Sequence, residues 1–240
     1  MAQQDTAIVV GVGPGLGAAL VRRFARAGMN VAAAARNPDK LSALVAELAG
    51  RARAYACDAA DERAVTQLFA DVVRDFSAPR LVVFNAGAFV RKGILDTTAE
   101  EFERCWRTAC LGGFLVGREA ARTMLAAQTG GKHRGTVIFT GATASLRGGA
   151  MFHNLAVGKF GLRALAQSMA REFQPQGVHI AHVIIDGQIA SERPGHSVAE
   201  RGEDAVLAPD AIAESYYQLH LQPPSAWTLE LDLRPYVEEF

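Results

Sequence analysis

The hydrophobic positions of this chain follow a repeating order, in which a short apolar run is followed by a longer segment with helical spacing. The short runs predict strands at 7–10, 30–34, 53–56, 81–84, 136–140 and 178–185. The longer segments predict helices at 16–27, 40–49, 64–75, 99–128 and 151–173. Several of the short runs have no polar face, which indicates strands that helices cover on both sides of a sheet.

The pattern changes after residue 185. Residues 191–205 mix charges, glycine and proline without an apolar period, and predict a mobile loop. A further helix is predicted at 209–221 and an edge-like strand at 227–233. Strands that alternate with helices favour right-handed crossovers. The sequence therefore predicts a single domain over residues 1–240, with an α/β Rossmann-type fold: a doubly wound parallel sheet of about seven strands flanked by helices.

Composition argues against several classes of protein. Half of the 240 residues are hydrophobic and 21% are charged, which suits a sizeable core. The 25 basic and 25 acidic residues cancel, so charge gives no case for nucleic acid or an anionic membrane as a partner. No stretch reaches the roughly 18 apolar residues of a membrane span, and the polar start is unlike an export signal. The three cysteines lack a metal-like spacing, so we expect reduced thiols, no metal site and a cytoplasmic location.

A glycine-rich loop at 11–17, GVGPGLG, joins the first predicted strand to the first predicted helix. Glycines permit the tight turn and let a diphosphate approach bare backbone, while the helix N-terminus behind the loop offers free N–H groups. Gly13, Gly15 and Ala18 fit the spacing G-x-G-x-x-A. The alternative is a purely structural turn, but the position after the first strand favours dinucleotide binding. The expected binding residues of this loop are Gly11, Gly13, Gly15, Leu16 and Gly17.

The end of the second predicted strand bears on which dinucleotide is bound. An acidic residue there would bind the ribose 2′-hydroxyl of NAD, and a basic residue would accommodate the 2′-phosphate of NADP. This chain has Arg36 and no acid before Pro38. We therefore expect NADP(H) to be preferred, with NAD(H) possible. The alternative is that Arg36 is only a solvated side chain at a strand end.

From about residue 8 to residue 191 the chain resembles the short-chain dehydrogenase/reductase family. Gly11, Gly15 and Gly17 match the family's G-x-x-x-G-x-G spacing. Asp58 matches its adenine-contacting aspartate, and 85–87 (NAG) matches the motif that lines the nicotinamide side of its cleft. The family usually has P-G-x-x-x-T after the sixth strand, where this chain has DGQIAS. The resemblance implies cofactor contacts at Asp58, Asn85, Ala86, Gly87, Lys159, Gly187, Ile189 and Ser191.

The family's catalytic Asn, Ser, Tyr and Lys are only partly present. Lys159 fits the Lys position, but Leu155 stands four residues earlier, where the family has its proton-transferring Tyr. The Ser position falls on Ala142 and the Asn position on Ala109. Loss of a general acid costs about 10²–10⁴ in rate, so the family's usual mechanism is not available here.

Two nearby residues are candidates to replace the missing groups, and both have plainer interpretations. His153 lies two positions before Leu155, which on a regular helix points it away from the cleft. Thr143 could polarise a carbonyl, but hydroxyl residues after strands are also common turn formers. Cys110 is interpreted as a packed thiol, and His179 and His182 as residues at the faces of the sixth strand without a metal-binding pattern.

An aromatic stripe bears on self-association. Phe102, Trp106 and Phe114 share one helix face, and a stripe of this kind belongs to the core or to a dimer contact more often than to a ligand site. By its resemblance to the family, the chain is expected to form a homodimer or homotetramer.

Three functional hypotheses follow. The first is an NADP(H)-preferring oxidoreductase that acts on a carbonyl or alcohol of unknown identity through a non-standard active site. The second is a catalytically inactive cofactor-binding protein that senses redox state or binds a partner. The third, a structural subunit without cofactor, is disfavoured by the retained Arg36, Asp58, Asn85 and Lys159. The fold alone cannot choose among the three.

Overall fold

The computed structural model describes residues 4–128, 131–192 and 195–238, and its centre is one parallel sheet. The strands are β1 Thr6–Val10, β2 Asn30–Ala35, β3 Ala52–Ala56, β4 Pro79–Phe84, β5 Gly135–Thr140, β6 Val178–Ile185 and β7 Glu230–Leu233. Their order is β3-β2-β1-β4-β5-β6-β7. This arrangement confirms the predicted doubly wound sheet, and the predicted strand at 227–233 is confirmed with a later start.

The sheet changes its direction of growth at β1. The chain first adds β2 and β3 on one side of β1, and then returns to place β4 on the other side. Val10 is level with Ala34 of β2 and with Phe84 of β4, so the three strands end together. Ligands of open α/β sheets bind outside the carboxyl ends of the strands at such a reversal. The loops after β1 and β4 therefore meet where a dinucleotide is expected.

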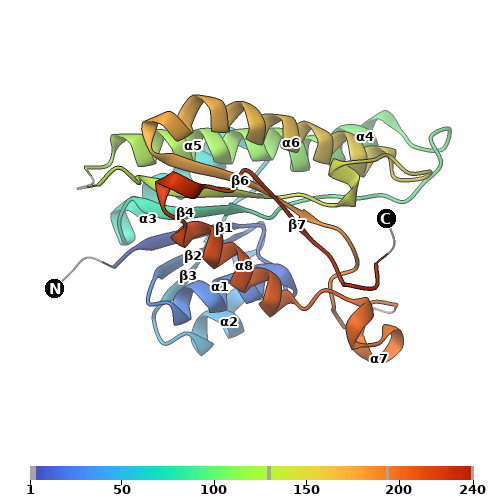
Figure 1. Ribbon diagram of the computed structural model, residues 1–240, viewed down its shortest axis with the longest axis horizontal. Helices are drawn as coiled ribbons and strands as arrows, with labels where there is room; N and C mark the ends of the chain where they lie inside the picture. The colour runs from blue at the N-terminus through green and yellow to red at the C-terminus, as the bar shows by residue number, and fades with distance from the viewer. Residues whose placement is uncertain (1–3, 129–130, 193–194, 239–240) are drawn as a thin grey trace.

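Helices cover both faces of the sheet (Figure 1). One face carries α1 Leu16–Arg26, α2 Ser42–Glu47 and α8 Pro209–Leu221, and its core includes the buried Phe24 and Tyr216. The other carries α3 Glu62–Asp75, α5 Gly112–Ala126 and α6 His153–Phe173, and its core includes Phe84 and Phe139. Every residue of β1, β5 and β6 is buried, which explains why these strands lack a polar face in the sequence.

The predicted helix at 99–128 is not continuous. Helix α4, Ala99–Trp106, begins with a capping box between Thr98 and Glu101. A π-helical turn at Arg107–Leu111 follows and leads into α5. The spacing of apolar residues does not reveal this π-helical turn, because the helix continues in the same direction before and after it.

The segment predicted as a loop at 191–205 is partly helical, so that prediction is wrong for its second half. Helix α7, Val198–Arg201, is capped by Ser197 and Glu200 in a capping box, and a 3-10 turn follows at Glu203–Ala205. The S-x-x-E pattern carries a local start signal that does not need an apolar period. Arg193 and Pro194 lie outside the described residues.

Two further expectations are corrected. The predicted helix at 40–49 is a 3-10 turn, Pro38–Leu41, followed by the six-residue α2. The stripe of Phe102, Trp106 and Phe114 is not core, because these side chains are 38%, 37% and 42% exposed. No helix within the described residues has both the length and the apolar character that crossing a bilayer requires.

Candidate active site

The glycine loop follows β1 and is held against the end of β2. The backbone N–H groups of Gly11 and Val12 both donate to the carbonyl of Ala34 at 3.0 Å. Gly11 has a φ of +91°, and a Cβ there would lie 2.5 Å from the backbone nitrogen of Ala86. Both the backbone conformation and the close approach of the β4 loop therefore require glycine at position 11.

The glycines of this loop divide into two groups. A Cβ on Gly17 would lie 2.8 Å from the Cα of Val12, so Gly17, like Gly11, is required by packing. A Cβ on Gly13 or Gly15 would meet nothing within 4 Å. Protein packing does not explain these two glycines, whereas bare backbone beside the N-terminus of α1 suits a diphosphate. The buried Leu16 anchors the start of α1.

Arg36 and Asp58 follow the neighbouring strands β2 and β3, and both side chains are exposed. Arg36 lies two residues after Ala34, the residue that holds the glycine loop. The carboxylate of Asp58 accepts the backbone N–H of Ala60 at 2.9 Å, which fixes the turn after β3. The structure thus brings both residues to the edge of the sheet that carries the glycine loop.

The loop after β4 is joined to the glycine loop by Asn85. Its backbone N–H donates to Val10 at 2.8 Å, and its side-chain amide donates to the carbonyl of Gly11 at 3.1 Å. Ala86 packs against Gly11, and a Cβ on Gly87 would lie 3.8 Å from the Nζ of Lys159. The NAG motif therefore lies between the glycine loop and α6.

Lys159 is buried at the carboxyl end of β5. Its Nζ donates to the carbonyl of Thr140 at 2.6 Å, and its side chain has no carboxylate partner among the described residues. The residue is only 6% exposed. Burial without a compensating anion lowers the pKa of this ammonium to about 8.

The positions of the missing catalytic groups surround this lysine without offering a hydroxyl. Leu155, one helical turn before Lys159, is half-buried, and Ala142 follows β5. Ala109 is buried inside the π-helical turn, where a Cβ on Gly158 of α6 would approach within 2.9 Å of it. Tyr216 is close to β5, but it is enclosed on the α8 face and donates to the hydroxyl of Thr140 at 3.0 Å. It cannot take the place of a substrate-contacting tyrosine.

Thr143 belongs to a polar chain that links three segments. Its hydroxyl donates to the carboxylate of Asp186, which follows β6 and is 4% exposed. Asp186 also forms an ion pair with Arg234, after β7, at 3.1 Å. The proton of the Thr143 hydroxyl is thus directed to Asp186. The sequence does not reveal the ion pair between Asp186 and Arg234, because no local pattern links residues that are 48 positions apart.

A second polar pair supports the turn that contains Ala142. The hydroxyl of Ser145 accepts the backbone N–H of Ala142 at 3.1 Å and lies 3.4 Å from Nε2 of His182. His182 and Ser145 are both fully buried, and burial lowers the pKa of His182 to about 4. His182 is therefore a neutral interior residue at neutral pH. His179 is also fully buried, so both histidines of β6 are covered by neighbouring layers.

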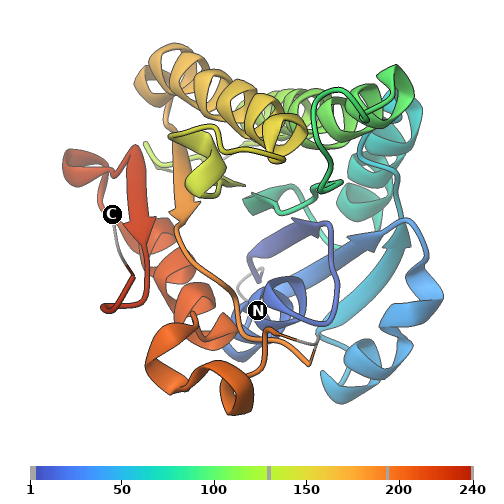
Figure 2. The same ribbon diagram turned by 90° about the vertical axis from the view of Figure 1, so that its right-hand side faces the viewer.

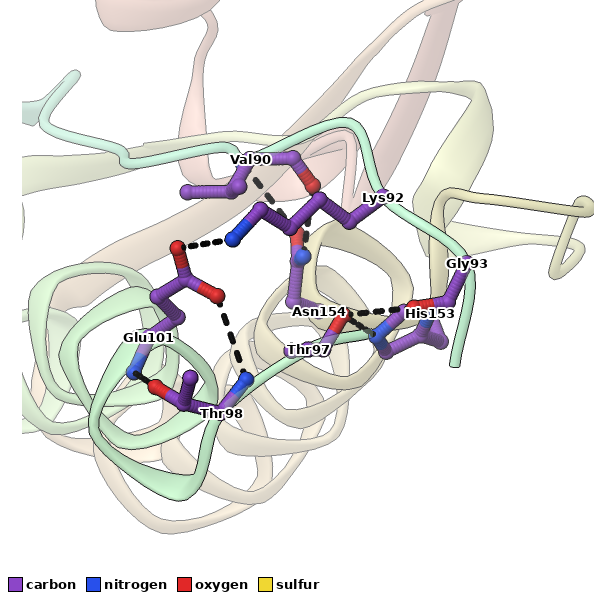
Figure 3. A network of polar contacts seen from close by, with 8 residues as sticks. All are labelled: Val90, Lys92, Gly93, Thr97, Thr98, Glu101, His153 and Asn154. Atoms are coloured by element: carbon purple, nitrogen blue, oxygen red, sulfur yellow. Dashed lines mark hydrogen bonds and ion pairs between the residues drawn. The ribbon is translucent and has the colours of Figure 1, made fainter. Parts of the chain in front are cut away.

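His153 is directed toward α4 and the loop before it. Its Nε2 lies 3.0 Å from the hydroxyl of Thr97, which itself donates to the carbonyl of Gly93 (Figure 3). The imidazole therefore donates to Thr97, and its ring stacks on Phe102 with centroids 6.4 Å apart. The structure gives His153 partners on the far side of the α6 start and does not bring it to Lys159.

The segment after β6 carries Gly187, Ile189 and Ser191 to the same edge of the sheet. Gly187 has a φ of +140°, and a Cβ there would lie 2.8 Å from the ring of Pro235. Ile189 forms a bridge with Leu207, and the N–H of Ser191 donates to His196 at 3.0 Å. These contacts fold the segment over the carboxyl edge. Figure 2 views the molecule from the side on which the β4–α4 loop and the start of α6 lie.

The remaining candidates are distant or inert. Burial raises the pKa of Cys57 to about 12 and raises the pKa of Cys105 and Cys110, so these thiols stay protonated at neutral pH.

Two surface hollows lie at the opposite edge of the sheet, around Arg134 and Arg80. Because open α/β sheets bind ligands beyond their carboxyl ends, we place the active site at the glycine loop and not in these hollows.

Comparison with known proteins gives consistent matches. The family model for short chain dehydrogenases matches residues 5–194. A short-chain dehydrogenase/reductase of Armillaria gallica is 35% identical over 185 residues, which cover 75% of this chain and 69% of the relative. A solved short-chain dehydrogenase from Rhodopseudomonas palustris is 42% identical with a TM-score of 0.82, covering 97% of this chain and 99% of that structure. A metagenomic short-chain oxidoreductase in complex with NADP is 27% identical with a TM-score of 0.82, covering 98% and 99%.

Proposed function

Because the chain belongs to the short-chain dehydrogenase/reductase family, we propose that it is an NADP(H)-preferring oxidoreductase that interconverts a carbonyl compound and its alcohol through a non-standard active site. The observation that carries this proposal is Lys159, a buried ammonium beside Gly87 at the carboxyl end of β5. A protein that bound only the adenosine end of a dinucleotide would have no use for a buried cation there. Burial of an unpaired cation costs free energy, and a functional site accounts for that cost.

Residues of this chain suit each part of the dinucleotide. The bare backbone at Gly13 and Gly15 would receive the diphosphate at the N-terminus of α1. Arg36 would pair with the 2′-phosphate, and Asp58 would contact the adenine, as the family resemblance implies. Lys159 and the NAG motif would hold the nicotinamide end. When bound, the reduced cofactor supplies the hydride that the protein cannot.

Lys159 is the best-supported proton donor of the three candidates. With a pKa of about 8, its ammonium is largely protonated at neutral pH and gives a proton more readily than an exposed lysine. Thr143 already donates its proton to Asp186, and His153 donates to Thr97. In carbonyl reduction, Lys159 would transfer its proton to the substrate oxygen as hydride reaches the carbon, and water would reprotonate the amine.

The cofactor preference is tested by titrating the protein with NADPH and with NADH in a calorimeter. Arg36→Ala removes a charge-assisted contact worth about 1.5–3 kcal/mol, so we expect NADPH binding to weaken about tenfold or more. NADH binding should not change. Lys40→Ala, which removes a nearby exposed cation from the turn after β2, is the control. Equal losses for both cofactors in Arg36→Ala would contradict the preference for NADP(H).

A second function is favoured by the leucine and alanines at the catalytic positions. A cofactor-binding protein without turnover, which senses redox state or binds a partner, would tolerate Leu155, Ala142 and Ala109. A panel of carbonyl compounds with NADPH separates the two proposals. Tight NADPH binding with no turnover of any compound would favour the inactive protein, and turnover would exclude it.

The outer face of the α4–α6 layer supports self-association as a homodimer or homotetramer. Besides Phe102, Trp106 and Phe114, the helix α6 exposes Val157 and Phe160, by 43% and 42%. An accumulation of exposed large apolar side chains on the helices of one layer is typical of interfaces. Light scattering on the purified protein measures the number of chains in the assembly.

A further inference from the structure

Two phenylalanines form a stacked pair beside the catalytic positions. The rings of Phe89 and Phe152 lie 4.9 Å apart at an interplanar angle of 18°. Phe89 is two residues beyond Gly87, and Phe152 is three residues before Leu155. The pair therefore bridges the loop after β4 and the start of α6, the two segments that flank Lys159. Phe89 is 42% exposed, so one ring of the pair keeps surface that a ligand can cover.

The loop that carries Phe89 is fixed in place by α6. The side chain of Asn154 bonds both backbone groups of Val90: its Nδ2 donates to the carbonyl at 2.6 Å, and its Oδ1 accepts the N–H at 3.4 Å. Further along the loop, His153 holds Thr97, and Lys92 pairs with Glu101 at 2.6 Å (Figure 3). Phe89 and Arg91 stand on either side of the clamped Val90. A ligand that used them would not have to order the loop, which lowers the entropic cost of binding.

The same surface carries an unpaired positive charge. The guanidinium of Arg91 lies 5.6 Å from the centroid of Phe152. The neighbouring Lys92 pairs with Glu101, but Arg91 has no carboxylate partner among the described residues. A guanidinium that stacks on a ring still has N–H groups in its plane, and these match the two oxygens of a carboxylate.

We infer that the substrate of the proposed oxidoreductase is an aromatic ketone, or its alcohol, that carries a carboxylate. Its ring stacks on the exposed side of Phe89, which Phe152 supports from behind, its carboxylate pairs with Arg91, and its carbonyl faces Lys159. Leu155 adds apolar surface one helical turn beyond Phe152. The inference rests on the proposed function, because it takes Lys159 to mark the reacting end of the cleft.

The test is calorimetric titration of the protein saturated with NADP⁺, which binds the ketone without reducing it. Three probes isolate the two features: 4-acetylbenzoate has both, acetophenone lacks the carboxylate, and 4-oxopentanoate lacks the ring. We expect 4-acetylbenzoate to bind about tenfold or more tightly than either of the others. Equal binding of the three probes, or tightest binding of 4-oxopentanoate, would overturn the inference.

Two variants assign the effects to residues. Arg91→Gln should weaken 4-acetylbenzoate to the level of acetophenone and leave acetophenone unchanged, whereas Arg104→Gln, on α4, should change neither. Phe89→Leu keeps the apolar volume and should weaken both aromatic probes about threefold to tenfold, but not 4-oxopentanoate. A preference for 4-acetylbenzoate that survives both substitutions would overturn the assignment.

Failure of the proposed function gives a different result. If the initial titration shows no binding of NADP⁺, the proposed function fails. The three probes can then be titrated into the free protein, where the stacked rings and Arg91 are still present. If NADP⁺ binds and the probes are not distinguished, only the substrate inference fails.

Discussion

Lys159 has an environment that differs from that of most lysines in two respects that act together. Its ammonium is removed from water, which disfavours the charged form, and its hydrogen-bond partner among the described residues is the carbonyl of Thr140 instead of a carboxylate. An exposed lysine has a pKa near 10.4 and holds its proton throughout the neutral range. With a pKa of about 8, this residue would suit both roles proposed for it, which are binding of the cofactor and delivery of a proton.

The pH dependence of activity should follow this lysine. Carbonyl reduction needs the protonated amine, so kcat/KM for reduction should be constant below pH 7 and fall as the pH rises through about 8. Alcohol oxidation needs the neutral amine and should rise over the same range. Lys159→Arg retains a charge that cannot be lost near neutrality and should remove this inflection, while Lys159→Met should lower kcat by about 10²–10⁴. An inflection near pH 8 that persists in Lys159→Arg would assign the proton transfer to another group.

Leu155 gives a second test at the scale of single residues. Leu155→Tyr places a hydroxyl one helical turn before the Lys159 ammonium, which would lower the pKa of the phenol. We expect turnover of a reducible carbonyl to rise by at least about tenfold, toward the 10²–10⁴ that a general acid supplies. Leu155→Phe introduces the same ring without the hydroxyl and is the matched control. Equal turnover in the two variants would show that the site lacks the geometry to use the phenol.

At the scale of elements, the strands and the glycine loop are predictable because their signals are local. The apolar run at 7–10, followed at once by glycine, is enough to predict β1 and the turn after it. The π-helical turn at Arg107–Leu111 is not predictable in this way, because it leaves the apolar stripe intact. The contacts that build the site are also beyond local pattern: Thr143 meets Asp186 across 43 positions, and Asn154 meets Val90 across 64. The glycine loop could therefore be predicted from the sequence, whereas the long-range contacts of Thr143 and Asn154 could not.

The clamp between α6 and the β4–α4 loop makes a measurable contribution at this scale. Asn154→Ala leaves the N–H and the carbonyl of Val90 without their partner. Because Val90 is half-buried, water can replace the lost hydrogen bonds only in part. We expect the free energy of unfolding to fall by about 1–2 kcal/mol. Hydrogen exchange should quicken at residues 88–98 and stay unchanged in α1, which serves as the internal control. Faster exchange throughout the chain would indicate a global loss of stability instead of a released loop.

At the scale of the whole molecule, burial outweighs nearby acidic groups at several histidines, since Glu230 acts on His182 and Asp5 acts on His133 without preventing the fall in their pKa. Burial lowers the pKa of His182 to about 4 and of His220 to about 3, and it also lowers the pKa of His179 and His133. Ring contacts gather His133, His179 and His220 around Trp227, whereas His182 lies beside Ser145. Each must be neutral in the folded protein, while the same side chain takes up a proton near pH 6.5 when the chain unfolds.

Stability should therefore decline in mild acid. A histidine with a lowered pKa in the folded state adds stability above about pH 6.5 and loses it as the pH falls toward the folded value. Between pH 7 and pH 5, each histidine that stays neutral in the folded state should cost about 2 kcal/mol. Carboxylates with lowered pKa values, such as Glu230, act mainly below about pH 5, so each changes the stability in this range far less than a histidine does.

Urea unfolding at pH 7 and pH 5 measures this decline. His182→Gln removes one titrating group and should reduce the pH dependence, whatever its effect at pH 7. His196→Gln, in the 191–205 segment outside these buried positions, is the matched control. A free energy of unfolding that is the same at both pH values would contradict the assignment of these histidines as neutral.

The segment after β7 has a practical consequence for handling the protein. Arg234 pairs with Asp186, Pro235 lies against Gly187, and the hydroxyl of Tyr236 donates to Asp204 at 3.1 Å, so this segment reaches the carboxyl edge of the sheet. The start of β1 lies at the opposite edge of the sheet, away from the segment after β7 (Figure 1). An affinity tag or a surface linkage placed ahead of β1 would leave the cofactor edge facing the solution. The same attachment after β7 would emerge beside that edge and compete with the molecules under study.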